Sequence, residues 1–130
     1  MEKSPGKILI VDDEPSLLKM MSVYLGRLGY EVETSASTDD AAGRVEANPF
    51  AYAIAVLDAT MPGMSMTESA LRMLRSNPSL RVVTASGYPV NMSEIEAAAP
   101  ARVAFLPKPF TPEMLASLVR RMIAAQEEDL

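Results

Sequence analysis

Three carboxylates stand at the ends of apolar segments in this 130-residue chain. Asp12 and Asp13 follow the apolar residues 8–11, and Asp58 follows residues 53–57. An ionised carboxylate is costly to bury at the end of an apolar strand unless a cation or hydrogen-bond donors offset its charge. Magnesium prefers such oxygen ligands, and a carboxylate beside it can act as a nucleophile toward phosphorus. The pattern therefore predicts a metal-dependent phosphoacceptor site.

Two further polar residues follow apolar segments later in the chain. Ser86 comes after residues 81–85, and Lys108 comes after residues 102–106 and Pro107. Ligands of open α/β sheets bind outside the carboxyl ends of the strands, so we expect these side chains to converge with the three acids. Acids so close together repel one another unless positive charge offsets them. Lys108 and a divalent cation are predicted to supply that charge.

The composition restricts the chemistry of such a site. The chain has no histidine and no cysteine, which excludes imidazole and thiolate ligands and a cysteine nucleophile. A metal site must therefore be built from oxygen, which favours Mg²⁺ or Mn²⁺. The net charge is -5 and the twelve basic residues are scattered, which argues against a direct nucleic-acid partner.

Hydropathy argues against membrane insertion. No apolar stretch approaches the roughly 20 residues that a membrane-spanning helix needs. The first seven residues are charged and lead directly into a strand, without the long apolar segment of a signal peptide. We therefore expect a cytoplasmic location.

Apolar strands alternate with helical patterns along the chain, which is typical of a parallel sheet covered on both faces. The predicted strands are residues 7–11, 31–35, 53–57, 81–85 and 102–106. The predicted helices run from Pro15 to Gly29, over residues 39–47 and 67–76, from an N-cap at Ser93, and onward from an N-cap at Thr111.

The second strand differs from the others because residues 31–33 alternate between charged and apolar. One wet face is typical of an edge strand, whereas the other four runs are apolar enough to be buried on both faces. The predicted fold is a doubly wound, five-stranded parallel α/β sheet of order 2-1-3-4-5. We expect a single domain over residues 1–130, with a core of about 7–125 and an acidic tail from residue 126.

Four motifs at the strand ends resemble those of response-regulator receiver domains of bacterial two-component signalling, of the chemotaxis-regulator-like kind. They are residues 10–14 (IVDDE), residues 57–58 (LD) with 61–64 (MPGM), residues 85–88 (ASGY) and residues 106–110 (LPKPF). The resemblance extends over residues 7 to about 125. It implies a flavodoxin-like three-layer sandwich and a signalling domain that catalyses only its own phosphorylation and dephosphorylation.

The resemblance also implies roles for the acids. Asp58 would accept a phosphoryl group from a phosphohistidine on a sensor histidine kinase or a histidine phosphotransfer protein. Asp13, Asp58 and the backbone carbonyl of Thr60 would bind the metal directly, and Asp12 would bind it through water. Lys108 would contact the phosphoryl group, aimed by a cis peptide bond to Pro109.

Switching is the second implication of the resemblance. Ser86 would move to bond a phosphoryl oxygen and Phe105 would turn inward. These movements would remodel the surface of the fourth helix, the fifth strand and the fifth helix for a downstream protein partner. Thr60 and Tyr88 occupy the positions that tune phosphoryl lifetime, and Met66 stands where receivers commonly have glycine, so we expect a loop of altered stiffness or shape.

Structural explanations exist for each residue taken singly. Asp12 and Asp13 could cap the first helix, Asp58 could form a turn with Pro62 and Gly63, and Lys108 could be a solvated loop residue. A lone aromatic on a strand such as Phe105 is usually part of the core. The joint occurrence of four motifs in register favours function over these explanations.

Three rival functions share parts of the pattern. A phosphatase of the haloacid-dehalogenase kind also uses an aspartyl nucleophile and magnesium, but it carries both acids of an Asp-x-Asp motif on its first strand. A flavodoxin-like cofactor binder needs a phosphate loop after that strand, which Asp12 and Asp13 would repel. A degenerate receiver used only for interaction would lack site residues that this chain has. The chain could be a complete regulator or a segment of a hybrid kinase or longer regulator.

Overall fold

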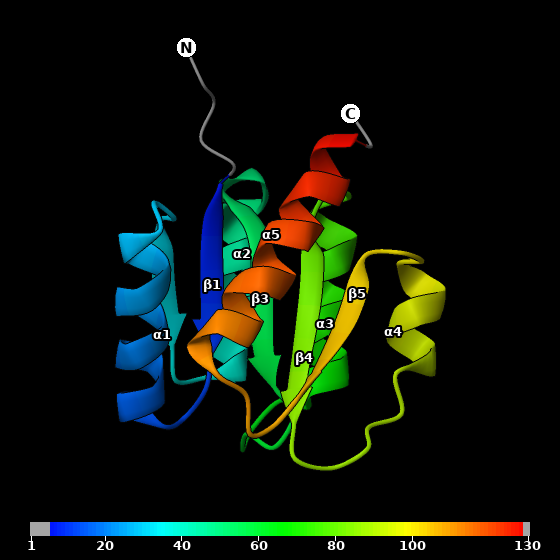
Figure 1. The fold of residues 1–130 in the computed structure, drawn as a ribbon. Coiled ribbons are helices and arrows are strands. Elements are labelled where there is room, and N and C mark those ends of the chain that lie inside the picture. The colour runs from blue at the N-terminus through cyan, green and yellow to red at the C-terminus, as the bar shows by residue number, and fades with distance from the viewer. Residues whose placement is uncertain (1–5, 129–130) are drawn as a thin grey trace.

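A computed structural model describes residues 6–128, with side chains described as far as residue 125. Strands and helices alternate along these residues (Figure 1). The elements are β1 (Lys7–Val11), α1 (Pro15–Arg27), β2 (Val32–Ser35), α2 (Thr38–Ala47), the 3-10 turn η1 (Pro49–Ala51), β3 (Tyr52–Asp58), α3 (Met66–Ser76), β4 (Arg81–Ser86), α4 (Ser93–Ala98), β5 (Val103–Pro107) and α5 (Pro112–Glu128).

The strands form one parallel sheet in the order β2-β1-β3-β4-β5, as predicted. The central strands β1, β3 and β4 carry continuous apolar runs because both faces of the sheet are covered. Strand order reverses between β1 and β3, which lie side by side with Val11 opposite Leu57. The first residues beyond this pair, Asp12 and Asp58, therefore meet at the carboxyl edge of the sheet.

Two apolar layers hold the helices on the sheet. Buried residues of α2, α3 and α4 pack on one face of the sheet, and those of α1 and α5 pack on the other. Figure 1 shows α5 crossing in front of the strands while α2 and α3 lie behind them. This arrangement is the three-layer sandwich predicted from the alternating pattern. Within the described residues, no helix is long and apolar enough to cross a bilayer.

Most helix ends follow the predicted signals. Pro15 opens α1, and Gly29 lies just beyond its end with a φ of 99° that favours glycine. The hydroxyl of Thr111 accepts a hydrogen bond from the Met114 N–H at 3.1 Å, so Thr111 caps α5. Helix α5 continues to Glu128. The predicted acidic tail is therefore helical over its first three residues, and residues 129–130 lie outside the described residues.

The bounds of β2, β3, β4, β5 and α3 differ from the predictions by one residue at one or both ends, and three further differences have a physical reason. Helix α2 begins one residue early, at Thr38, because the Ser37 side chain caps it by accepting a hydrogen bond from the Asp40 N–H. Ser93 is the first residue of α4 rather than its N-cap, and its N–H donates to Asn91 Oδ1. Strand β5 is only partly buried because it forms the second edge of the sheet.

Candidate metal centre

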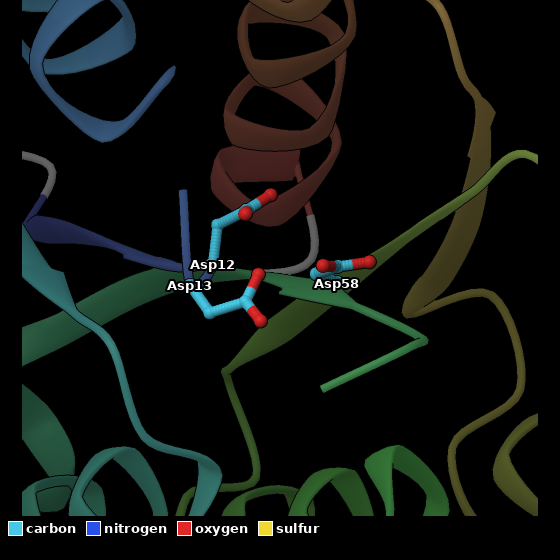
Figure 2. Close-up of side chains that lie close together, drawn as sticks. All are labelled: Asp12, Asp13 and Asp58. Atoms are coloured by element: carbon cyan, nitrogen blue, oxygen red, sulfur yellow. The ribbon is translucent and has the colours of Figure 1, made fainter. Parts of the chain in front are cut away.

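The three acids predicted to form a site lie together at the carboxyl edge of the sheet. One carboxylate oxygen from each of Asp12, Asp13 and Asp58 lies within 4.8 Å of the other two. Figure 2 shows the three side chains gathered where β1 and β3 end. Asp12 and Asp58 are 3 % and 4 % exposed, whereas Asp13 is open to solvent. The cluster is therefore buried on one side and accessible on the other.

Asp58 is held by the residues that follow it. Its Oδ1 atom accepts hydrogen bonds from the backbone N–H and the hydroxyl of Thr60, at 3.2 and 3.1 Å. The Ala59 N–H donates to the Ala85 carbonyl at 2.9 Å, which ties the start of this loop to β4. No side chain or N–H among residues 6–125 donates a hydrogen bond to Asp58 Oδ2. One oxygen of the carboxylate thus remains available for a ligand.

Asp12 makes contacts with both of its oxygens. Oδ1 accepts a hydrogen bond from the Glu14 N–H at 3.0 Å, and Oδ2 accepts one from Lys108 Nζ at 3.0 Å. The N-cap residue of α1 is Glu14, which makes no side-chain capping bond. The alternative in which Asp12 and Asp13 cap this helix is therefore wrong, because the Asp12 carboxylate bonds an N–H outside the helix.

Lys108 supplies positive charge from the far end of β5. Its ammonium lies 3.0 Å from Asp12 Oδ2 and 3.5 Å from Asp58 Oδ1. Burial lowers the Lys108 pKa, but the hydrogen bond and charge of Asp12, followed by those of Asp58, outweigh this and raise it above 10.5. The Lys108 N–H donates to the Ser86 carbonyl at 2.8 Å, and the peptide bond to Pro109 is cis, as the resemblance implied.

The remaining predicted site residues flank this cluster. Ser86 ends β4 and is 2 % exposed, and its Oγ accepts a hydrogen bond from the Tyr88 N–H at 3.0 Å. The Tyr88 side chain is 72 % exposed. Phe105 lies opposite Thr84 on edge strand β5 and is 39 % exposed. The core placement usual for such an aromatic is wrong for Phe105, because no strand among residues 6–128 pairs with that edge.

The donor set suits a hard divalent cation. The three acids offer only oxygen, which Mg²⁺ prefers, and their mutual repulsion favours a cation between them. Lys108 offsets part of this charge without occupying the exposed side, where Asp13 stands. A small anionic group such as a phosphoryl group can approach from that side and meet the cation and the ammonium together.

Two residues shape the loop after Asp58. Sequence reasoning missed Thr38, and it assigned Gly63 to a motif and a turn without its contact with α2. Thr38, at the start of α2, donates its hydroxyl to the Met64 carbonyl at 2.8 Å. Gly63 has a φ of 89°, and a Cβ built on it would lie 3.1 Å from Asp39 Oδ2. The capping signal of Ser37 with Asp40 three residues later would have placed Thr38 in the helix, but not against this loop.

Comparisons with known proteins agree on one family. A family model described as the response regulator receiver domain matches residues 8–120. The sensor kinase CckA of Brucella abortus (strain 2308) is 29 % identical over 120 residues, which cover 92 % of this chain and 13 % of that protein. The transcriptional regulatory protein ResD of Bacillus subtilis is 25 % identical, over 90 % of this chain and 48 % of that protein. The chain therefore spans less than half the length of these curated relatives.

Solved structures share the fold over nearly the whole chain. A CheY-like response regulator receiver domain protein from Methanospirillum hungatei JF-1 superposes with a TM-score of 0.85 and 27 % identity, covering 96 % of this chain and 98 % of that one. The response regulator protein TrrA from Thermotoga maritima, solved in complex with Mg(2+)-BeF, has a TM-score of 0.75 and 25 % identity. That match covers 90 % of this chain and 98 % of the other.

Proposed function

This chain belongs to the response regulator receiver domain family of two-component signalling proteins, and from that premise we propose that Asp58 is its phosphoacceptor. The observation that carries the proposal is the cluster of Asp12, Asp13 and Asp58 within 4.8 Å, facing the Lys108 ammonium. Receiver domains bind Mg²⁺ at such an acidic cluster and interact with histidine kinases or phosphotransfer proteins. The donor of the phosphoryl group is a phosphohistidine of one of these partners.

The transfer forms one bond and breaks another. An oxygen of the Asp58 carboxylate attacks phosphorus while the phosphorus–nitrogen bond to the partner imidazole breaks. The leaving nitrogen keeps the electron pair of that bond and takes a proton from water. The product is an acyl phosphate on Asp58. Oδ2 is the oxygen best placed to attack because Thr60 holds Oδ1 with two hydrogen bonds.

Asp13, Asp58 and the Thr60 carbonyl would hold Mg²⁺ directly, and Asp12 would hold it through water. When bound, the ion neutralises charge on the phosphoryl oxygens. TrrA from Thermotoga maritima, solved in complex with Mg(2+)-BeF, supports the binding of Mg²⁺ by this chain. Lys108 would turn from Asp12 toward a phosphoryl oxygen, which lies within reach because its ammonium is already 3.5 Å from Asp58.

Ser86 and Phe105 are the proposed switch. Ser86 Oγ accepts only the Tyr88 N–H among its described contacts, so its own proton is free to bond a phosphoryl oxygen. A cleft lined in part by Phe105, Val90 and Met92 separates α4 from the β5 edge. Movement of Phe105 into the domain would change this cleft and with it the α4-β5-α5 surface that a downstream protein recognises. Thr60 and Tyr88 border the site where hydrolytic water would enter.

Phosphorylation with a small phosphodonor tests the assignment. We expect wild-type protein incubated with acetyl phosphate and Mg²⁺ to gain one phosphoryl group by intact-protein mass spectrometry, and Asp58→Asn to gain none. Glu113→Gln, which removes an exposed carboxylate from the first turn of α5, is the matched control and should be phosphorylated like wild type. An unchanged adduct on Asp58→Asn would refute the proposal, and multiple turnover of a simple phosphate ester would favour the phosphatase alternative.

A further inference from the structure

The loop of residues 59–65 connects the acceptor strand to α3, and it is fixed at both ends. At its start, Thr60 donates two hydrogen bonds to Asp58 Oδ1. At its end, Ser65 caps α3 by accepting a hydrogen bond from the Glu68 N–H at 3.1 Å. Met66, the first residue of α3, is 6 % exposed and packs in the core. The position of the intervening residues is therefore set by whatever they contact outside the loop.

The N-terminus of α2 provides that contact. The Thr38 hydroxyl donates to the Met64 carbonyl at 2.8 Å, across 26 residues of sequence. Thr38 is 1 % exposed, and its own carbonyl accepts a hydrogen bond from the fully buried Ser69 hydroxyl at 3.2 Å. Ser69 of α3 therefore fixes the Thr38 backbone, and the buried Thr38 hydroxyl offers the Met64 carbonyl a donor in a fixed position.

Two further contacts restrict the same part of the loop, at Met64 and Gly63. Arg72 Nη1 lies 3.6 Å from the Met64 sulfur, while its guanidinium pairs with Glu46 of α2. Gly63 passes so close to Asp39 that a Cβ on it would lie 3.1 Å from Asp39 Oδ2. The loop thus lies against the start of α2 through its backbone at Gly63 and Met64, and against α3 through the Met64 side chain.

We propose that Thr38 is a positioning residue for the divalent cation, because its hydroxyl anchors the loop that carries the Thr60 carbonyl. The inference rests on the proposed metal-dependent function of the Asp12, Asp13 and Asp58 cluster. Without the hydroxyl, the Met64 carbonyl loses a buried donor and the loop gains conformational freedom. Binding of Mg²⁺ must then order the loop, so its affinity falls although none of its ligands has changed.

Magnesium titration of unphosphorylated protein tests this role. We expect Thr38→Val, which keeps the side-chain volume but removes the hydroxyl, to raise the Kd for Mg²⁺ measured by isothermal titration calorimetry about fivefold, as expected for the loss of one hydrogen bond. Thr38→Ser restores the donor and should restore the affinity. Thr84→Val makes the same change at a buried threonine whose hydroxyl contacts Met92 instead, and it should bind Mg²⁺ like wild type.

Hydrogen exchange supplies a second readout that does not depend on metal. Amides of residues 59–65 should exchange faster in metal-free Thr38→Val than in wild type, while those of β4 keep their rate. Should valine prevent folding, Thr38→Ala removes the hydroxyl without adding bulk and must meet the same prediction. Unchanged Mg²⁺ affinity in these variants, or equal weakening by Thr84→Val, would overturn the positioning role.

The phosphorylation assay separates this proposal from the one on which it rests. At saturating Mg²⁺, Thr38→Val should still gain one phosphoryl group, because the acceptor and Lys108 are intact. A wild type that binds Mg²⁺ but takes no phosphoryl group would refute the phosphoacceptor proposal alone. A wild type that binds no Mg²⁺ would refute both.

Discussion

At the carboxyl end of the sheet, Asp12 and Asp58 face the single ammonium of Lys108, whereas at the amino end Asn77 and Arg102 donate their hydrogen bonds to backbone carbonyls. Asn77 Nδ2 donates to the Pro49 and Tyr52 carbonyls. The two ends thus bury polar groups in opposite ways. The carboxyl end holds like charges that need an added cation, whereas the amino end pairs each donor with a carbonyl acceptor.

Arg102 shows the amino-end arrangement most clearly. Its guanidinium donates to the carbonyls of Leu80, Leu74 and Asn77, at 2.9, 3.3 and 3.0 Å. Burial lowers the Arg102 pKa, and the nearby Arg81 charge lowers it further. These bonds satisfy carbonyls at the end of α3 and in the turn before β4. The comparison teaches that matched donors stabilise the fold without a ligand, while unmatched acids leave a site where a ligand can bind.

The largest expected effect is at the amino end. Arg102→Met should lower the free energy of unfolding by about 3 kcal/mol, because three carbonyls lose a charged donor. Urea denaturation measures the change. Arg120→Met, at an exposed position of α5, is the matched control and should change stability by no more than about 0.5 kcal/mol. A loss as small as that of the control would mean that water replaces the guanidinium, and that the carbonyls at the amino end do not depend on Arg102 as a donor.

Magnesium should stabilise the protein through the acids at the carboxyl end of the sheet. At a Mg²⁺ concentration 100 times its Kd, the unfolding free energy of wild type should rise by about 2.7 kcal/mol. Arg102→Met should gain the same increment, since its change lies at the other end of the sheet, and Asp58→Asn should gain much less. Urea titrations with and without Mg²⁺ measure these increments. Equal gains by wild type and Asp58→Asn would show that the ion binds elsewhere.

Removal of the Lys108 ammonium should have the next largest effect on stability. Without metal at neutral pH, Lys108→Met should lower the unfolding free energy by about 1–2 kcal/mol, because it leaves Asp12 and Asp58 without their cation. The Lys108 pKa is raised above 10.5, so its contribution is complete from neutral pH to 10.5 and is lost as the pH rises through the folded-state pKa. Urea denaturation at several pH values measures the difference in unfolding free energy between wild type and Lys108→Met. A difference that vanishes well below pH 10.5 would contradict this prediction.

Glu33 provides the smallest test, since it is an acid with matched donors. The hydrogen bond from Lys7 lowers its pKa most, followed by that from Tyr52. Its contribution is therefore present above pH 4.5 and lost as the pH falls through the lower folded-state pKa. Glu33→Gln should cost less than about 1 kcal/mol at neutral pH and nothing in strong acid, by urea denaturation. A stabilising effect at neutral pH would contradict the matched arrangement.

The elements and the acid cluster were predictable because their signals are local. A strand buried on both faces must be apolar along its length, so the acids at its end stand out in the sequence. Parallel strands then bring residues 12 and 58 to one edge. The partners of single side chains were not predictable in this way. Arg102 was expected to begin the fifth strand, but it precedes β5 and bonds carbonyls from other elements.

Phe105 marks the same limit. Its segment is as apolar as a central strand, although the predicted order already placed this strand at an edge. That the ring is 39 % exposed there is shown only by the structure. The bond from Thr38 to the loop is likewise invisible in sequence, because the two residues are 26 positions apart. The exposure of a side chain and its long-range hydrogen bonds depend on how the helices pack on the sheet, which hydrophobic periodicity does not specify.

The sequence by itself determined the order of the elements and the chemical types that end each strand, because hydrophobic periodicity and capping act over a few residues. It also determined that any metal must bind oxygen, since histidine and cysteine are missing. Only the tertiary structure decided that Asp58 keeps one oxygen uncommitted, that Lys108 lies nearest Asp12, and that Thr38 anchors the loop. Those outcomes depend on distances of a few ångströms between distant segments, which only the packing of the whole chain sets.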